Sequence, residues 1–198
     1  MTAPSPTLEQ AIAAARACRL CEAKLPLGPR PVLMLRPGAR LLIVGQAPGT
    51  KVHETGVPYN DRSGDRLRDW LGVDRPTFYE NPRIGILPMG MCYPGRDPRG
   101  GDLPPIAECG PTWHPRLRPL LTDIRLTLLI GQYAQAYYLA ARRKRSLTDT
   151  VRAWREYLPD FLPLPHPSWR NTGWLAKNPW FAREIVPALQ KRVRALVL

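Results

Sequence analysis

The sequence predicts an α/β fold, a three-layer α/β/α sandwich with a mainly parallel, four-stranded central sheet. Short, continuous apolar runs are typical of strands that a parallel sheet buries on both faces. Helical patterns lie before, between and after these runs, as in a chain that alternates strand and helix. The length of 198 residues fits one domain. We therefore expect residues 1–198 to form a single domain.

The four predicted strands are short and end at turn signals. They lie at 41–44, 84–87, 126–130 and 161–164. Gly45 ends the first run. The last run is the weakest, because Pro163 lacks a backbone N–H and is tolerated only at an edge or a strand end. We expect this strand to lie at an edge of the sheet.

Helical spacing is clearest near the N-terminus, where Leu8, Ile12 and Ala15 share one stripe and Thr7 can cap the first turn. The predicted helices lie at 7–19, 65–71, 133–141, 148–158 and 179–198. Ligands of such folds bind beyond the carboxyl ends of the strands. Three motifs fall at those places: residues 45–49 (Gly-Gln-Ala-Pro-Gly), the Cys92 loop, and residues 166–168 (His-Pro-Ser).

The charge balance favours a polyanionic partner. Lys and Arg number 29 against 16 Asp and Glu, a formal net charge of +13, and 24 of the basic residues are Arg. The Arg guanidinium forks onto phosphates and stacks on bases, which suits nucleic acid. No apolar stretch is long enough to span a membrane, and the N-terminus lacks a signal-peptide pattern. We expect a monomeric cytoplasmic protein that binds DNA and no membrane.

The first and the last of these motifs carry distinct chemistry. Glycines in the first let backbone N–H groups approach a ligand closely, but its spacing fits neither a Walker phosphate loop nor a dinucleotide fingerprint. His166 can donate to an oxygen that develops negative charge, or can serve only as a structural hydrogen-bonder, and Ser168 can hold a phosphate. His53 and Glu54 are a candidate acid–base pair, or part of a solvated loop.

Taken together, these motifs resemble those of the uracil-DNA glycosylase superfamily, with Gly-Glu/Gln-x-Pro after strand one and a late His-Pro-Ser. Residues 55–59 (Thr-Gly-Val-Pro-Tyr) resemble the Thr-Gly-Arg-Pro-Phe segment of the family four enzymes. That aromatic residue stacks on the extruded base, a role that falls to Tyr59 if it is not ordinary packing. The resemblance covers nearly the whole chain and implies a uracil-DNA glycosylase-like fold.

The four cysteines fit the same comparison. Cys18 and Cys21 form a C-x-x-C pair, and Cys92 and Cys109 follow with 16 residues between them. Iron–sulfur family four enzymes have a similar pattern. Four thiolates satisfy a 4Fe-4S cluster or a tetrahedral zinc ion equally well, and four buried free thiols are the remaining alternative. We expect a metal site, and a cluster before zinc.

The resemblance also implies roles for individual residues in base excision repair. The catalytic residues are Gln46, which positions the attacking water, and His166, which faces the base O2. The base-binding residues are Gly45, Ala47 and Tyr59. The DNA-binding residues are Ser168 on a backbone phosphate and the wedge residues Trp169, Arg170 and Asn171.

The sequence also departs from the family pattern. The most active branch has an Asp where this chain has Ala47, and family four has an Asn that reads uracil where this chain has Pro88. Asn60 is a candidate substitute for that Asn. The predicted function is a hydrolase that removes uracil or another deaminated base from DNA. The alternative is a glycosylase-like protein that binds damaged or abasic DNA with little or no turnover.

Overall fold

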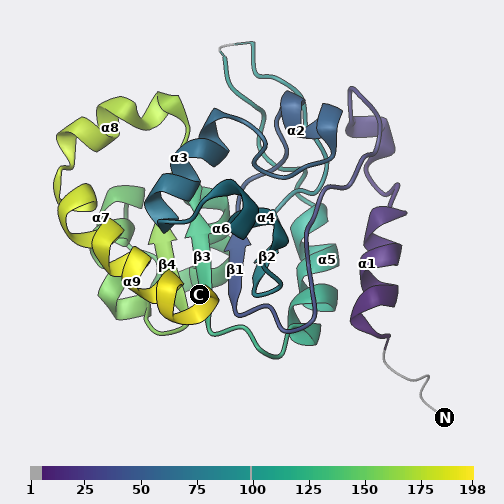
Figure 1. Cartoon of the computed structure of the whole chain (residues 1–198). Coiled ribbons are helices and arrows are strands. Elements are labelled where there is room, and N and C mark those ends of the chain that lie inside the picture. The colour runs from purple at the N-terminus through teal and green to yellow at the C-terminus, as the bar shows by residue number, and fades with distance from the viewer. Residues whose placement is uncertain (1–5, 99) are drawn as a thin grey trace.

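The computed structural model describes residues 6–98 and 100–198, and its centre is a four-stranded sheet (Figure 1). The strands are β1 (Leu41–Val44), β2 (Ile84–Ile86), β3 (Leu126–Ile130) and β4 (Phe161–Leu164). Their order is β2-β1-β3-β4, and every neighbouring pair is parallel. The predicted α/β fold and all four strands are confirmed, with the second strand ending one residue early. The Pro-containing strand lies at an edge, as expected.

Nine α-helices surround the sheet in the described part of the chain. They are α1 (Leu8–Arg16), α2 (Thr50–Thr55), α3 (Arg62–Leu71), α4 (Arg75–Glu80), α5 (Cys109–Leu117), α6 (Gly131–Leu139), α7 (Leu147–Arg152), α8 (Thr172–Lys177) and α9 (Val186–Val197). Thr7 caps α1 in a capping box with Gln10, so that predicted helix start is confirmed.

Two of the predicted helices are shorter or more irregular than their patterns indicate. The helix expected over 148–158 is α7 followed by a 3-10 turn at Trp154–Tyr157. The helix expected over 179–198 is a π-helical turn at Phe181–Ile185 that runs into α9. In both places large aromatic side chains pack inward, since Trp154, Tyr157 and Phe181 are almost fully buried. Tertiary packing decides these segments more than helical periodicity does.

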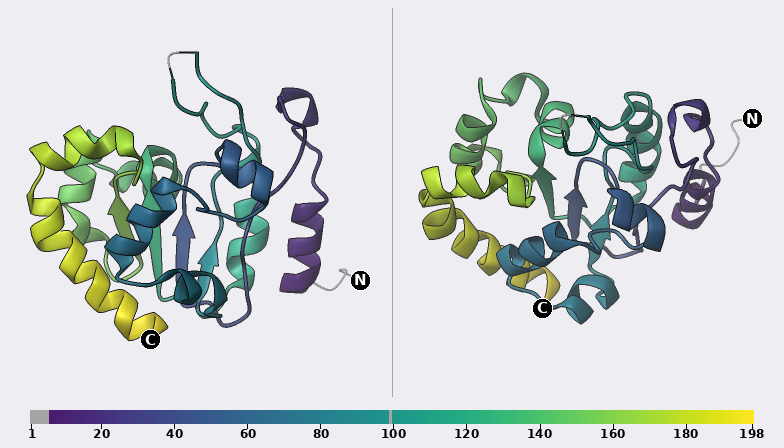
Figure 2. Two further views of the ribbon diagram at one scale, coloured as in Figure 1. Left: turned by 45° about the horizontal axis from the view of Figure 1, so that its top comes forward. Right: turned by 90° about the horizontal axis from the view of Figure 1, so that it is seen from above.

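The strands bury both faces because alternate residues point to opposite sides. Leu41 and Ile43 of β1 belong to an apolar core with side chains of α3, α4, α7 and α9, whereas Leu42 and Val44 belong to a second core with α1, α5 and α6. Figure 2 shows the two layers of helices on either side of the sheet. The predicted three-layer sandwich is therefore confirmed. None of the helices in residues 6–98 and 100–198 is long and apolar enough to cross a membrane.

The parallel topology brings distant loops to one edge of the sheet. The chain leaves β1 toward β2 and leaves β3 toward β4, so the loops diverge between β1 and β3. A crevice opens at such a switch point beyond the carboxyl ends of the strands. The first motif follows β1, Pro88 follows β2 and His166 follows β4.

Candidate functional site

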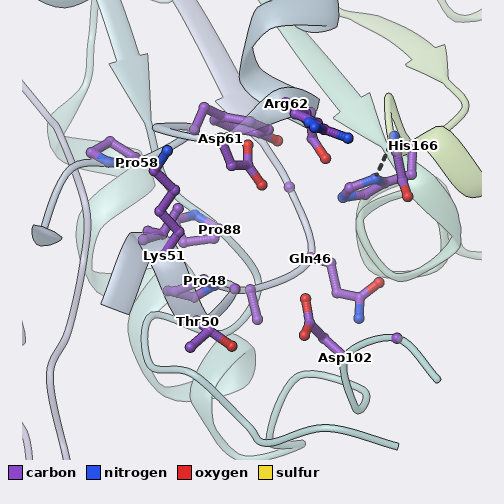
Figure 3. A pocket seen from close by; sticks show the side chains of 18 of the residues that line it. Gln46, Pro48, Thr50, Lys51, Pro58, Asp61, Arg62, Pro88, Asp102 and His166 are labelled. Atoms are coloured by element: carbon purple, nitrogen blue, oxygen red, sulfur yellow. Dashed lines mark hydrogen bonds between the residues drawn. The ribbon is translucent and has the colours of Figure 1, made fainter. Parts of the chain in front are cut away.

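A cavity of about 740 Å³ opens at that carboxyl edge, a size suited to a small-molecule or nucleobase ligand. Every candidate catalytic, base-binding and DNA-binding residue from the sequence lines it: Gly45, Gln46, Ala47, Tyr59, His166, Ser168, Trp169, Arg170 and Asn171. We call this cavity the cleft. Figure 3 shows Gln46 and His166 on one side of it and Lys51 and Pro58 on the other. The first and last motifs therefore meet at one place.

The first motif is held by the loop that follows β2. Met89 N–H donates to Gly45 O (2.9 Å), and Gly90 N–H donates to Gln46 O (2.8 Å). No carbonyl of the described residues accepts from the N–H of Gln46 or Ala47. These two N–H groups are the available backbone donors of a turn that lines the cleft.

Tyr59 is fixed in an uncommon backbone conformation. Its φ of 55° lies in the left-handed region, which costs a non-glycine residue about 1 kcal/mol or more and concentrates at functional sites. A Cβ on Gly64 would lie 1.7 Å from Tyr59 O, and a Cβ on Gly45 would lie 2.4 Å from the Tyr59 hydroxyl. Residue 64 therefore requires glycine because the clash is with backbone, whereas a side chain at residue 45 would displace the Tyr59 ring. Burial raises the pKa of Tyr59, so the ring remains a neutral phenol wall of the cleft.

Two arginines of α3 position the loops around Tyr59 and His166. Arg68 donates to Tyr59 O (3.4 Å) and pairs with Asp65. Arg66 donates to Ser168 O (2.9 Å). Neither residue could be recognised from the sequence, because an arginine among many carries no signal until its partner is known.

His166 is held as a neutral hydrogen-bond donor. Ser168 N–H donates to His166 Nδ1 (3.1 Å), so Nδ1 is unprotonated and the proton of the neutral ring lies on Nε2. Burial lowers the pKa of His166, and the charge of Asp61 opposes this shift. An Nε2–H aimed into a cleft can stabilise negative charge on a ligand oxygen without itself being an imidazolium.

The wedge residues have mixed surroundings. Trp169 is 66% exposed, and the Arg170 guanidinium lies over its ring, 5.0 Å from the centroid. The Asn171 side chain instead donates to His166 O (2.7 Å), so it braces the imidazole loop. Ser168 Oγ accepts from Arg170 N–H (3.2 Å), which leaves its hydroxyl proton for a ligand.

Two residues that the sequence analysis considered lie elsewhere. Asn60 is absent from the cleft lining, and its Oδ1 accepts from Arg75 (2.7 Å), so it does not replace the missing Asn. His53 lies on α2 with its ring 6.1 Å from that of Tyr93 and does not line the cleft. The proposed pair with Glu54 is therefore not part of this site.

Pro88 lines the cleft and offers no side-chain hydrogen bond there. His114 Nε2 lies 3.1 Å from Pro88 O, and its Nδ1 lies 2.7 Å from the Tyr138 hydroxyl. Because Pro88 O can only accept, His114 carries its proton on Nε2. Burial lowers the pKa of His114 to about 4. A buried neutral imidazole thus fixes the cleft wall at the position where an Asn was expected.

The cleft also contains charged residues that the sequence analysis did not single out. They are Lys51, Asp61, Arg62, Arg96 and Asp102. Asp61 follows Tyr59 by two residues and caps α3, accepting from Gly64 N–H (2.9 Å). No motif marked these residues, and Asp102 comes from a loop distant from both motifs in the sequence.

All four cysteines line a second, small cavity of about 20 Å³ near the loop that follows β2. Their thiols are free, and among the described residues no group of three or more His, Cys, Asp or Glu side chains is already positioned to hold a metal ion. Trp113 Nε1–H donates to Cys18 Sγ (3.3 Å), and Met91 N–H donates to Cys109 Sγ (3.4 Å). Four sulfurs around one cavity, two of them accepting N–H bonds, fit the donor set of a cluster or a zinc ion.

Comparison with known families shows to which superfamily this chain belongs. The model of the uracil DNA glycosylase superfamily matches residues 34–190. The chain belongs to that superfamily. The match contains every residue of the cleft named above, and it begins after Cys18 and Cys21.

A solved structure is also similar to this chain. The solution NMR structure of a candidate uracil DNA glycosylase from Methanosarcina acetivorans is 17% identical, with a TM-score of 0.47 over 83% of this chain and 94% of that one. The superfamily assignment itself rests on the matched family model.

Proposed function

We propose that this protein is a DNA-repair glycosylase that hydrolyses the N-glycosidic bond of uracil or another deaminated base turned out of DNA. Superfamily membership supports the reaction class. The observation that carries the proposal is the meeting of a neutral His166, oriented by Ser168 N–H, with Tyr59 and the free N–H groups of the first motif in one cleft.

In this proposal each side of the cleft has a task. The extruded base stacks on Tyr59, a contact that is typically worth about 1–3 kcal/mol. As the C1′–N bond breaks, negative charge develops on the base, and His166 Nε2–H with the N–H groups of Gln46 and Ala47 stabilises it. Ser168 donates to a backbone phosphate, and Trp169 with Arg170 fills the vacated stack. The positive net charge strengthens binding to DNA.

We further propose that the four cysteines hold a 4Fe-4S cluster, with zinc as the alternative. Cys18 and Cys21 precede β1, Cys92 follows β2 and Cys109 begins α5. A bound cluster supplies four metal–thiolate bonds that fasten these segments together. Cys92 belongs to the loop after β2, and Gly90 of this loop donates its N–H to Gln46 O of the first motif. Monomeric state and cytoplasmic location remain predictions.

The test uses labelled oligonucleotides, single- and double-stranded, that carry uracil, hypoxanthine or xanthine, followed by alkaline cleavage at abasic sites. We expect cleavage of at least one of these substrates, with the preferred base released from the DNA fastest. Binding should weaken steeply as salt rises, because phosphate contacts release counterions.

The alternative function is binding of damaged or abasic DNA without turnover. Ala47 and Pro88 favour it, since neither side chain offers a hydrogen bond to water or base. Tight binding to an abasic duplex with no cleavage of any substrate, even at excess protein, would support this alternative and contradict the glycosylase proposal.

A further inference from the structure

Two carboxylates line the cleft, and they differ in what else they touch. Asp61 caps α3 through Gly64 N–H, and its charge acts on His166. No hydrogen bond or ion pair joins the Asp102 carboxylate to another described residue, although the charges of Arg96 and Arg170 act on it. Figure 3 shows Asp102 on the same side of the cleft as Gln46, away from Asp61. Among the described residues, Asp102 is therefore the cleft carboxylate without a hydrogen-bond partner, and it can bind a ligand or a water molecule.

Asp102 is held in place by a pair of antiparallel arms, residues 95–97 and 100–103. The backbone of Asp102 forms an antiparallel β-bridge with that of Arg96, and Leu103 N–H donates to Gly95 O (2.9 Å). The carboxylate reaches the first motif, because its Oδ2 lies 3.3 Å from where a Cβ on Gly49 would stand. The backbone pairing thus carries a charged side chain to the turn that follows β1.

The same arm orients Gln46. Gln46 Nε2 donates to Leu103 O (3.0 Å), which fixes the amide and leaves Oε1 as its free acceptor. A water molecule has two protons to donate, and a carboxylate oxygen and an amide oxygen are both acceptors. Held between them, a water directs a lone pair away from both groups.

We propose that Asp102 and Gln46 together hold the attacking water, and that Asp102 acts as the general base that Ala47 cannot supply. This inference rests on the proposed glycosylase function. The water oxygen forms a bond to C1′ of the deoxyribose, and one water proton passes to the Asp102 carboxylate. The C1′–N bond breaks, and its electron pair leaves with the base. The base anion is stabilised by His166 and then takes up a proton, so that the products are free base and an abasic sugar.

The surroundings of Asp102 suit a general base. Burial, and next the charge of Asp61, raise the pKa of Asp102, whereas Arg96 and Arg170 lower it. A base whose pKa is raised toward the working pH accepts a proton more readily in the transition state. The base form is lost when pH falls below this raised pKa, so the cleavage rate should decline on the acid side.

The first experiment measures single-turnover cleavage of the preferred oligonucleotide by wild-type protein, Asp102→Asn and Glu54→Gln. Glu54 is an exposed residue of α2 outside the cleft, so its variant matches the charge change. We expect Asp102→Asn to be about 100-fold slower or more, to bind DNA normally and to lose the acid limb of the rate profile. We expect Glu54→Gln to behave as wild type.

The second experiment does not depend on turnover. It compares binding of a duplex with a cationic pyrrolidine abasic analogue and one with a neutral tetrahydrofuran analogue. A carboxylate beside the reacting sugar favours the cation, so wild-type protein should prefer the pyrrolidine duplex by about tenfold, and Asp102→Asn should lose that preference.

The outcomes separate this inference from the proposed function. If wild-type protein cleaves no base, the glycosylase proposal fails, and the analogue preference still tests Asp102. If Asp102→Asn keeps both the wild-type rate and the preference, the inference about Asp102 is wrong while the glycosylase proposal stands. If Asp61→Asn loses both and Asp102→Asn loses neither, Asp61 is the base and the inference is again wrong.

Discussion

The cleft and the cysteine cavity are built from the same loop after β2, yet they differ in kind. Pro88 faces the cleft, whereas Gly90, Met91 and Cys92 line the cysteine cavity. The cleft gathers polar groups, such as the Asp102 carboxylate, that form no hydrogen bond with the other described residues. The cysteine cavity gathers four like side chains that join separate segments. The difference indicates that chemistry and anchoring are divided between two neighbouring sites, one for each side of a single loop.

The strongest test of this division is His166→Ala. Loss of one preorganised donor to a developing anion typically costs about 100- to 1,000-fold in rate. We expect that loss in single-turnover cleavage, with DNA binding and the midpoint of thermal unfolding close to wild type. An unchanged rate would remove His166 from the mechanism.

His114, which contacts Pro88 O behind the cleft, should make the free energy of unfolding depend on pH. In the unfolded chain His114 has the ordinary pKa of 6.5, and in the folded protein its pKa is about 4. Between these values the unfolded state binds a proton that the folded state does not, so the free energy of unfolding falls as pH falls. The contribution is about 3 kcal/mol, present above pH 6.5 and lost toward pH 4.

Urea unfolding at pH 7 and at pH 4.5 measures this effect. His114→Gln keeps a donor for Pro88 O but cannot titrate, and the other ionisable groups are common to both proteins. We expect the loss of stability between the two pH values to be smaller in His114→Gln. An equal loss in both proteins would show that His114 does not carry it.

The cysteine cavity should show the opposite behaviour to His166. We expect Cys109→Ser to bind less metal and to unfold with about 2 kcal/mol less free energy, a fall of about 4–8 °C in Tm. Cleavage below the transition should stay within a few-fold of wild type. Absorbance of the thiolate-to-iron bands and metal analysis distinguish cluster, zinc and empty thiols, and a colourless, metal-free protein prepared without oxygen would contradict both metal proposals.

The smallest effect should come from Gly45→Ala, because a Cβ there meets the Tyr59 hydroxyl at 2.4 Å but the ring carbon behind it only at 3.3 Å. We expect the displaced ring to weaken substrate binding about tenfold, or about 1.4 kcal/mol. Tyr59→Phe in the same chain removes the hydroxyl and should restore much of the binding. No rescue in the double variant would mean that Gly45 does not act through Tyr59.

The fold and the principal motifs could be predicted because their signals are local. Apolar runs mark β1 to β4, and the glycines and prolines around them mark the turns. The two motifs could be placed together because parallel strands end at one edge. The six-residue helices α2, α4 and α8 carried too few turns for a periodic signal to stand out, and α5 contains Pro115, which obscures its helical pattern.

The charged part of the cleft could not be predicted in the same way. Asp102 lies far along the chain from Gln46. The two are brought together because Gln46 Nε2 donates to the carbonyl of Leu103, the residue after Asp102, and only the folded backbone creates this contact. The roles of Asn60 and His53 failed for the converse reason: they neighbour Tyr59 and the first motif in sequence, but their side chains turn toward Arg75 and Tyr93.

The edge position of β4 affects how readily molecules of this protein can associate through their sheets. Asp160 O accepts from Thr127 N–H, and because the backbone groups of a strand alternate in direction, the backbone nitrogens of the buried residues Pro163 and Pro165 point away from β3. Neither proline has an N–H, so this edge of the sheet lacks a donor at two positions where another strand would need one. The same prolines that made this strand the hardest to recognise in the sequence therefore disfavour edge-to-edge aggregation of the folded protein.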